Sequence, residues 1–186
     1  GMQKNILVII VCLSQLLANA QCAVQEQTNC TFRAIGHRAY SHIYPENTLE
    51  ALEEAFKRGI KYCEVDVSLT KDNVYVLFHD ENALNRTTNG YGKINELTVA
   101  EIKQLDAGSW KDSVFTNTKV PTLSEALILA EKYNAQLYLD TKDFSSTALK
   151  NALTEAKVAS HRLFPSISSI EDAQLFRTVL PNTPWV

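Results

Sequence analysis

The feature that most constrains this chain is a repeated alternation of short, apolar, β-prone runs with segments of helical periodicity. Strands are predicted at 31–36, 62–69, 74–78, 136–141 and 163–167. Helices are predicted between them at 47–58, 122–133, 146–158 and 169–180. Because strands alternate with helices along most of the chain, the pattern favours an α/β fold with parallel strands.

The number of repeats indicates which α/β fold is present. The chain contains about five strand–helix units and the opening of a sixth at Trp185. A TIM (β/α)8 barrel has eight strands and typically about 250 residues. We therefore predict the first five to six strands of such a barrel, with the chain ending inside a strand and the barrel domain incomplete.

One segment interrupts the alternation of strands and helices. Residues 80–121 contain Asn89-Gly90, Gly92 and Gly108, which are typical of turns, and a short helix candidate that begins at Thr98. We interpret this segment as an insertion beside the top of the barrel, within one domain that covers 34–186.

The first twenty residues resemble a targeting segment. Gly1 precedes the start Met2 as an added residue, Lys4 is followed by an apolar stretch over 6–17, and Ala18-Asn19-Ala20 fits an A-x-A cleavage site. The stretch is shorter than the roughly 20 residues that span a bilayer. The pattern predicts a signal peptide over 1–20, a lead-in over 21–33, and an exported, periplasmic or extracellular chain with no transmembrane helix after cleavage.

The cysteines are not expected to carry the function. Cys22 and Cys30 are close enough for a small loop in an oxidising compartment, and Cys63 is expected as a buried thiol. A lipid anchor at Cys22 stays an alternative, although Gln21 is a poor residue before a lipidated cysteine. No spacing typical of zinc is present.

Charge excludes one class of partner. Lys and Arg number 18 against 21 Asp and Glu, which gives a net charge of -3 without long runs of one sign. This balance argues against nucleic acid as the main partner.

Three carboxylates are candidate ligands for a metal ion. Glu64 and Asp66 are two residues apart on a predicted strand, so both side chains point to one face, and Asp140 ends a later strand. Three carboxylates without cysteine suit a hard cation such as Ca²⁺ or Mg²⁺. The alternative is an exposed strand face on which Glu64 and Asp66 pair with Lys61 or Lys71.

Two histidines are candidates for acid–base catalysis. His37 and His79 each follow a predicted strand, and the carboxyl ends of barrel strands line the active-site mouth. Histidine titrates near neutrality, so two of them can serve one substrate as acid and base. The alternative is a hydrogen-bonded surface or core histidine, which is how we interpret His42 and His161.

Two cations and an acid lie near the same strand ends. Arg38 and Lys142 could contact a phosphate, or they could be ordinary solvated cations. Asn47 is explained as a helix N-cap, and Glu46 would favour the positive end of that helix.

Several short motifs, taken together, resemble the glycerophosphodiester phosphodiesterase family. The resemblance runs from Ile35 to the C-terminus, and no single motif carries it. The motifs are Gly36-His37-Arg38, Pro45-Glu46-Asn47-Thr48, Glu64-Val65-Asp66-Val67, Thr70-Lys71-Asp72, His79-Asp80, Arg86-Thr87-Thr88, Pro121-Thr122-Leu123 and Asp140-Thr141-Lys142.

The resemblance implies a barrel of the phospholipase-C-like phosphodiesterase type, hydrolysing small glycerophosphodiesters to glycerol 3-phosphate and an alcohol with a divalent cation. The roles it implies are catalytic for His37 and His79, metal-binding for Glu64, Asp66 and Asp140, and substrate-binding for Arg38, Glu46 and Lys142.

The chain departs from the family pattern in two residues. Ala39 stands where Gly usually follows His-Arg, which would strain the loop if that residue needs positive φ. Asp140 replaces the more common Glu.

Two other hypotheses remain beside the enzyme. One is a non-catalytic remnant of a truncated barrel that binds metal or phosphate. The other is a related phosphodiesterase acting on intact phospholipids, but no long apolar segment in the mature chain suggests a lipid-inserting loop.

Overall fold

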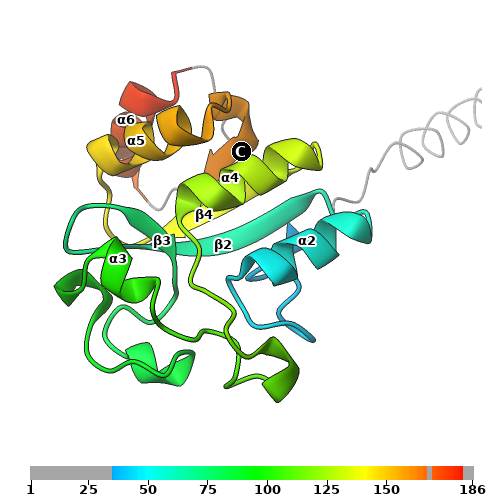
Figure 1. Ribbon diagram of the computed structural model, residues 1–186. Coiled ribbons are helices and arrows are strands. Elements are labelled where there is room, and N and C mark those ends of the chain that lie inside the picture. The colour runs from blue at the N-terminus through cyan, green and yellow to red at the C-terminus, as the bar shows by residue number, and fades with distance from the viewer. Residues whose placement is uncertain (1–34, 167–168, 182–186) are drawn as a thin grey trace, which may run out of the picture. The chain divides into compact units, whose positions relative to one another are not determined.

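The structure, a computed structural model, describes residues 35–166 and 169–181 (Figure 1). These residues belong to a compact unit that runs from Ala34 to Val186. Several predicted features lie outside the described residues: the signal peptide, the lead-in with Cys22 and Cys30, residues 31–34 of the first predicted strand, residue 167 and the strand start at Trp185. The side chain of His161 also lies outside them. Within the described ranges, no helix is both long enough and apolar enough to cross a bilayer.

The fold is built on a five-stranded sheet in which four strands follow the order β1-β2-β4-β5 and run parallel. The strands are β1 (Ile35–Gly36), β2 (Tyr62–Leu69), β3 (Tyr75–Leu77), β4 (Gln136–Thr141) and β5 (Leu163–Pro165). The predicted bounds 62–69 and 136–141 are confirmed.

The direction of β3 corrects the expectation that all strands are parallel. β3 pairs antiparallel with the end of β2, with Val67 opposite Leu77. The two strands are joined by a tight turn in which Asn73 N donates to Thr70 O over 3.0 Å. A parallel pair needs a crossover of a dozen or more residues, which this connection cannot supply. β3 therefore returns along β2 toward the middle of that strand.

Helices cover one face of the sheet (Figure 1). α2 packs on α4, α4 on α5, and α5 on α6. Their bounds are α2 (Leu49–Lys57), α4 (Leu123–Lys132), α5 (Ser146–Ala156) and α6 (Ile170–Val179).

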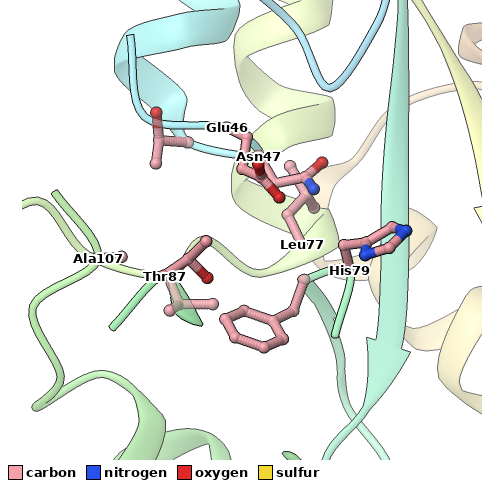
Figure 2. Close-up of a pocket in the computed structure, with 9 residues that line it drawn as sticks. Glu46, Asn47, Leu77, His79, Thr87 and Ala107 are labelled. Carbon is pink, nitrogen blue, oxygen red and sulfur yellow. The ribbon is translucent and has the colours of Figure 1, made fainter. Parts of the chain in front are cut away.

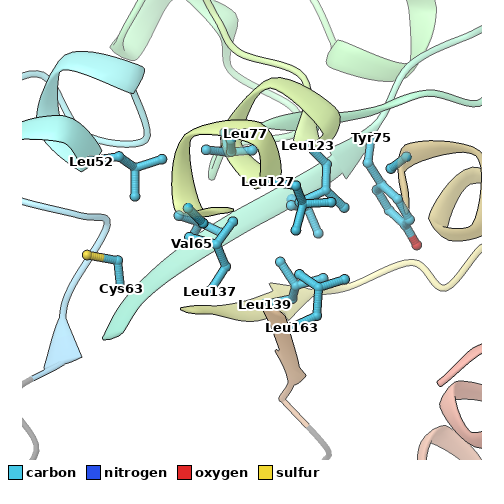
Figure 3. Close-up of a cluster of buried hydrophobic side chains, with 14 of the residues drawn as sticks. Leu52, Cys63, Val65, Tyr75, Leu77, Leu123, Leu127, Leu137, Leu139 and Leu163 are labelled. Atoms are coloured by element: carbon cyan, nitrogen blue, oxygen red, sulfur yellow. The ribbon is translucent and has the colours of Figure 1, made fainter. Parts of the chain in front are cut away.

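The core lies between these helices and the sheet (Figure 3). Alternate strand residues enter it, among them Val65 of β2 and Leu137 of β4, both fully buried. Cys63 is also buried, as predicted, and burial raises the pKa of its thiol to about 12. The thiol is therefore protonated and inert near neutral pH.

Two of the predicted helix starts are confirmed in atomic detail. Thr98 and Thr122 open α3 (Val99–Ile102) and α4 as capping boxes, each with a Glu three residues on. At the start of α2 the N-cap is Thr48, whose side chain accepts from Ala51 N. Asn47 is thus not the N-cap that we predicted.

The segment 80–121 forms a second apolar cluster of its own. It contains three 3₁₀ turns, η1 (Leu84–Arg86), η2 (Ile94–Glu96) and η3 (Ser113–Phe115), besides α3. β3 is shared between two cores, since Tyr75 and Leu77 face the main core while Val76 and the residue after the strand, Phe78, face this cluster.

The carboxylate of Asp106 holds a loop of this segment in place. Asp106 accepts hydrogen bonds from the backbone N–H groups of Gly108, Ser109 and Asn117. Burial alone would raise the pKa of Asp106, but these donors outweigh it and hold the pKa well below its usual range.

Candidate metal and phosphate site

The three predicted metal ligands lie together on the sheet face opposite the main core. Asp66 is directly opposite Asp140 in the pairing of β2 with β4, and Glu64 is two residues earlier on β2. One side-chain oxygen from each of the three lies within 4.8 Å of the others. Glu64 is half-buried, Asp66 buried and Asp140 exposed, so the cluster opens to solvent on the Asp140 side.

The cluster concentrates negative charge. Burial raises the pKa of Glu64 above its ordinary value, and the charges of Asp66 and Asp140 add to the rise. In the part of the chain that the structure describes, no Lys or Arg forms an ion pair with Glu64 or Asp140. A cation bound among them would supply the missing positive charge.

The donor set fits a hard divalent cation. Ca²⁺ takes oxygen ligands at about 2.3–2.6 Å, so two ligands of one ion can lie up to roughly 5 Å apart. The spread of the three carboxylates, within 4.8 Å, matches this requirement. Glu64, Asp66 and Asp140 could therefore hold a hard divalent cation.

The alternative of an exposed strand face paired with lysines is wrong. Asp66 is 6% exposed, and Arg38 pairs with it at 3.2 Å from Nε to Oδ2. Lys61 points elsewhere and donates from Nζ to the carbonyl oxygen of Tyr133.

Asn47 contributes to the site in a way that the sequence reasoning missed. Its Nδ2 donates to Asp66 Oδ2 over 2.8 Å, and its Oδ1 accepts from Asp66 N over 3.1 Å. Its backbone has φ 56, a left-handed conformation that Asn tolerates better than most residues. Asn47 thus fixes one oxygen of Asp66 and leaves Oδ1 for a ligand. The motif Pro45-Glu46-Asn47-Thr48 was the signal that could have revealed this role.

His79 and Lys142 lie beside the carboxylates. A small depression is lined by both, together with Asp66 and Asp140. Lys142 Nζ lies 3.4 Å from the carbonyl oxygen of His79, to which it donates. β3 is the element that brings His79 here, because it runs back along β2.

A second small cavity also borders His79. Figure 2 shows Glu46 and Asn47 on one wall, Thr87 and Ala107 on another, and His79 beyond the end of β3. The insertion therefore lines the space next to a predicted catalytic residue.

His37 is exposed and follows β1 directly. The next residue, Arg38, donates its backbone N–H to Glu64 Oε2 over 2.7 Å, so His37 lies one residue from a direct contact with that carboxylate. Both predicted catalytic histidines thus lie near the acidic cluster.

Arg38 and Glu46 are held together. Arg38 Nη1 donates to Glu46 Oε1 over 3.0 Å. Burial would raise the pKa of Glu46, but Arg86 and Arg38 outweigh it and lower the pKa. The Glu46 carboxylate lies between the two guanidinium groups.

The predicted strain at Ala39 is present. Ala39 has φ 66 and is 3% exposed, and its N–H donates to Glu64 O over 3.1 Å. A non-glycine residue in this region costs about 1–2 kcal/mol. The loop after β1 is therefore strained where the family usually has Gly.

We expect Ala39→Gly to leave the free energy of unfolding within about 0.5 kcal/mol of the parent, because relief of strain offsets the lost methyl and the added backbone entropy. Ala55→Gly is the matched control: Ala55 is fully buried in α2. That change has no strain to relieve and should cost about 1.5–2 kcal/mol. Equal losses in urea denaturation of the two variants would contradict the strain at Ala39.

Comparison with known families identifies the class of protein. Residues 37–176 match the glycerophosphoryl diester phosphodiesterase family. The chain belongs to this family. It is 40% identical over 127 residues to glycerophosphodiester phosphodiesterase 1 of Mus musculus, covering 66% of this chain and 38% of that protein. It is also 40% identical over 116 residues to a glycerophosphodiester phosphodiesterase of Bacillus subtilis, covering 58% of this chain and 39% of that protein.

Solved structures agree in fold. A glycerophosphodiester phosphodiesterase from Agrobacterium tumefaciens matches with a TM-score of 0.73 and 30% identity, over 83% of this chain and 66% of that one. A phosphodiesterase from Oleispira antarctica, in complex with the product sn-glycerol-3-phosphate, matches with a TM-score of 0.74 and 35% identity, over 81% and 63%. The five-stranded sheet with its helices is thus part of the TIM barrel of this family. The chain spans about two fifths of the length of the curated relatives.

Proposed function

We propose that the chain carries the metal-binding and catalytic part of an enzyme that hydrolyses glycerophosphodiesters to glycerol 3-phosphate and an alcohol. The observation that carries the proposal is the convergence of three carboxylates within 4.8 Å, with His79 and Lys142 lining the same depression. Its membership of the family and the product bound to the Oleispira antarctica relative support it.

The chemistry follows from the positions of these groups. A divalent cation held by Glu64, Asp66 and Asp140 would act as a Lewis acid on phosphoryl oxygens. Arg38 and Lys142 would attract the phosphate. One of His37 and His79 takes the proton of the attacking group, and the other gives a proton to the leaving alkoxide.

The test is hydrolysis of glycerophosphocholine with Ca²⁺, with Mg²⁺ and with a chelator. We expect metal-dependent release of glycerol 3-phosphate that falls at least about 100-fold in His37→Ala, since an acid–base residue contributes that much or more. His42→Ala, an exposed histidine of the same loop, is the control and should keep its activity.

The same assay tests the alternative of a non-catalytic remnant. A chain that is folded by circular dichroism and binds metal, yet shows no turnover, would contradict the enzyme and favour the remnant. Equal activity in His37→Ala and His42→Ala would contradict the role of His37.

A further inference from the structure

A chain of charged groups links His79 to Arg38. His79 Nδ1 lies 2.6 Å from Asp80 Oδ1, and Arg86 Nε forms an ion pair with Asp80 Oδ2. The same guanidinium binds both oxygens of Glu46 through Nη1 and Nη2. Glu46 in turn accepts from Arg38.

We propose that Arg86 is a positioning residue that fixes two groups of the site at once, the imidazole of His79 through Asp80 and the guanidinium of Arg38 through Glu46. The inference rests on the proposed function, because it assigns Arg86 to the support of those two groups. Arg86 itself belongs to η1 in the insertion.

The link to His79 determines which ring nitrogen carries the proton. A carboxylate accepts hydrogen bonds but cannot donate them, so a neutral His79 bonded to Asp80 carries its proton on Nδ1. Nε2 is then left with a lone pair for proton transfer. Asp80 can hold this arrangement only while its own orientation is fixed, and Arg86 occupies its second oxygen.

The link to Arg38 determines where its positive charge lies. Arg38 Nη1 is bound by Glu46, and Arg38 Nε pairs with Asp66 at 3.2 Å. Arg86 donates to both oxygens of the Glu46 carboxylate, including Oε1, which also accepts from Arg38, and so restrains that carboxylate from rotating away from Arg38.

The guanidinium is suited to this double task. Its charge is spread over three nitrogens of a planar fork, so Nε can form the ion pair with Asp80 while the two terminal nitrogens donate hydrogen bonds to Glu46. A lysine at this position would keep the charge but would place a single ammonium, which reaches one carboxylate or the other.

The first experiment measures the tautomer of His79 by ¹⁵N NMR of the imidazole, with the signal assigned by its loss in His79→Gln. We expect the Nδ1–H form to predominate in the parent. In Arg86→Gln the ratio of Nδ1–H to Nε2–H should fall at least about fivefold, since the support of Asp80 is lost. Arg58→Gln is the matched control: it removes an exposed Arg–Glu pair at the C-terminal end of α2 and should change nothing.

A second variant keeps the test decisive where Arg86→Gln does not fold. Arg86→Lys retains the positive charge, and we expect an intermediate ratio of tautomers. A ratio unchanged from the parent in either folded variant would overturn the proposal. This measurement needs no turnover, so it separates failure of the positioning role from failure of the proposed function.

Kinetics provide a second readout that a merely structural role would not reproduce. Asp80→Asn should lower kcat with little change in KM, and Glu46→Gln should chiefly raise KM. Arg86→Gln should do both, and Arg86→Lys should restore part of each. An effect of Arg86→Gln on kcat alone or on KM alone would contradict its action on both groups.

Discussion

Replacing Glu64 with Gln is expected to lower the affinity of the chain for Ca²⁺ or Mg²⁺ at least about tenfold. Mutation of a residue that only supports a metal ligand typically lowers metal affinity 10–100-fold. Removal of the charge of a ligand itself should lower the affinity as much or more. The amide keeps the shape of the side chain and one acceptor oxygen, so the change is chiefly in charge. Isothermal titration calorimetry with each metal measures it.

The control for this experiment is Glu155→Gln. It makes the same chemical change at an exposed position on α5 and should leave the affinity unchanged. If the parent and Glu64→Gln chains bind metal equally well, the three carboxylates are not the binding site, whatever the activity of the enzyme.

Truncation of Leu137 to Ala should reduce the free energy of unfolding by about 2–5 kcal/mol. Leu137 is fully buried in β4, where it lies between Cys63 of β2 and Leu163 of β5 (Figure 3). Its loss leaves a cavity between the sheet and the helices. The free energy of unfolding of a native protein is only about 5–15 kcal/mol, so this substitution would remove a large part of it.

Ile128→Ala on α4 is the comparison, because Ile128 is 51% exposed. Its effect should stay within about 0.5 kcal/mol. Urea denaturation followed by circular dichroism measures both variants. Similar midpoints for the two would mean that the sheet and its helices do not form the packed core described above.

The barrel part of the fold was largely predictable from local signals. β2 and β4 have the bounds that alternation of apolar and polar residues gave them, and the capping boxes at Thr98 and Thr122 fixed two helix starts. These features depend on neighbours in the sequence. The carboxylate cluster was predictable too, because strand periodicity places Glu64 and Asp66 on one face.

The remaining features depend on contacts between residues distant in the sequence. The antiparallel direction of β3 follows from the length of the turn after Leu69 rather than from the pattern of the strand itself. The sequence predicts a helix cap at Asn47 because a cap is the common local role of such a residue, whereas its partner, Asp66, is nineteen residues away. Arg86 contacts Glu46 across forty residues, a relation that no local pattern reports.

The sharing of β3 between two cores makes the position of His79 depend on residues that never approach a substrate. Val76 and Phe78 anchor the strand in the apolar cluster of the insertion, and His79 is the next residue along the chain. A substitution that loosens this cluster, for example at fully buried Ile102, would let the imidazole of His79 move. The carboxylates on β2 and β4 would keep their places. Two parts of one site can thus be lost separately, with metal binding retained after proton transfer has failed.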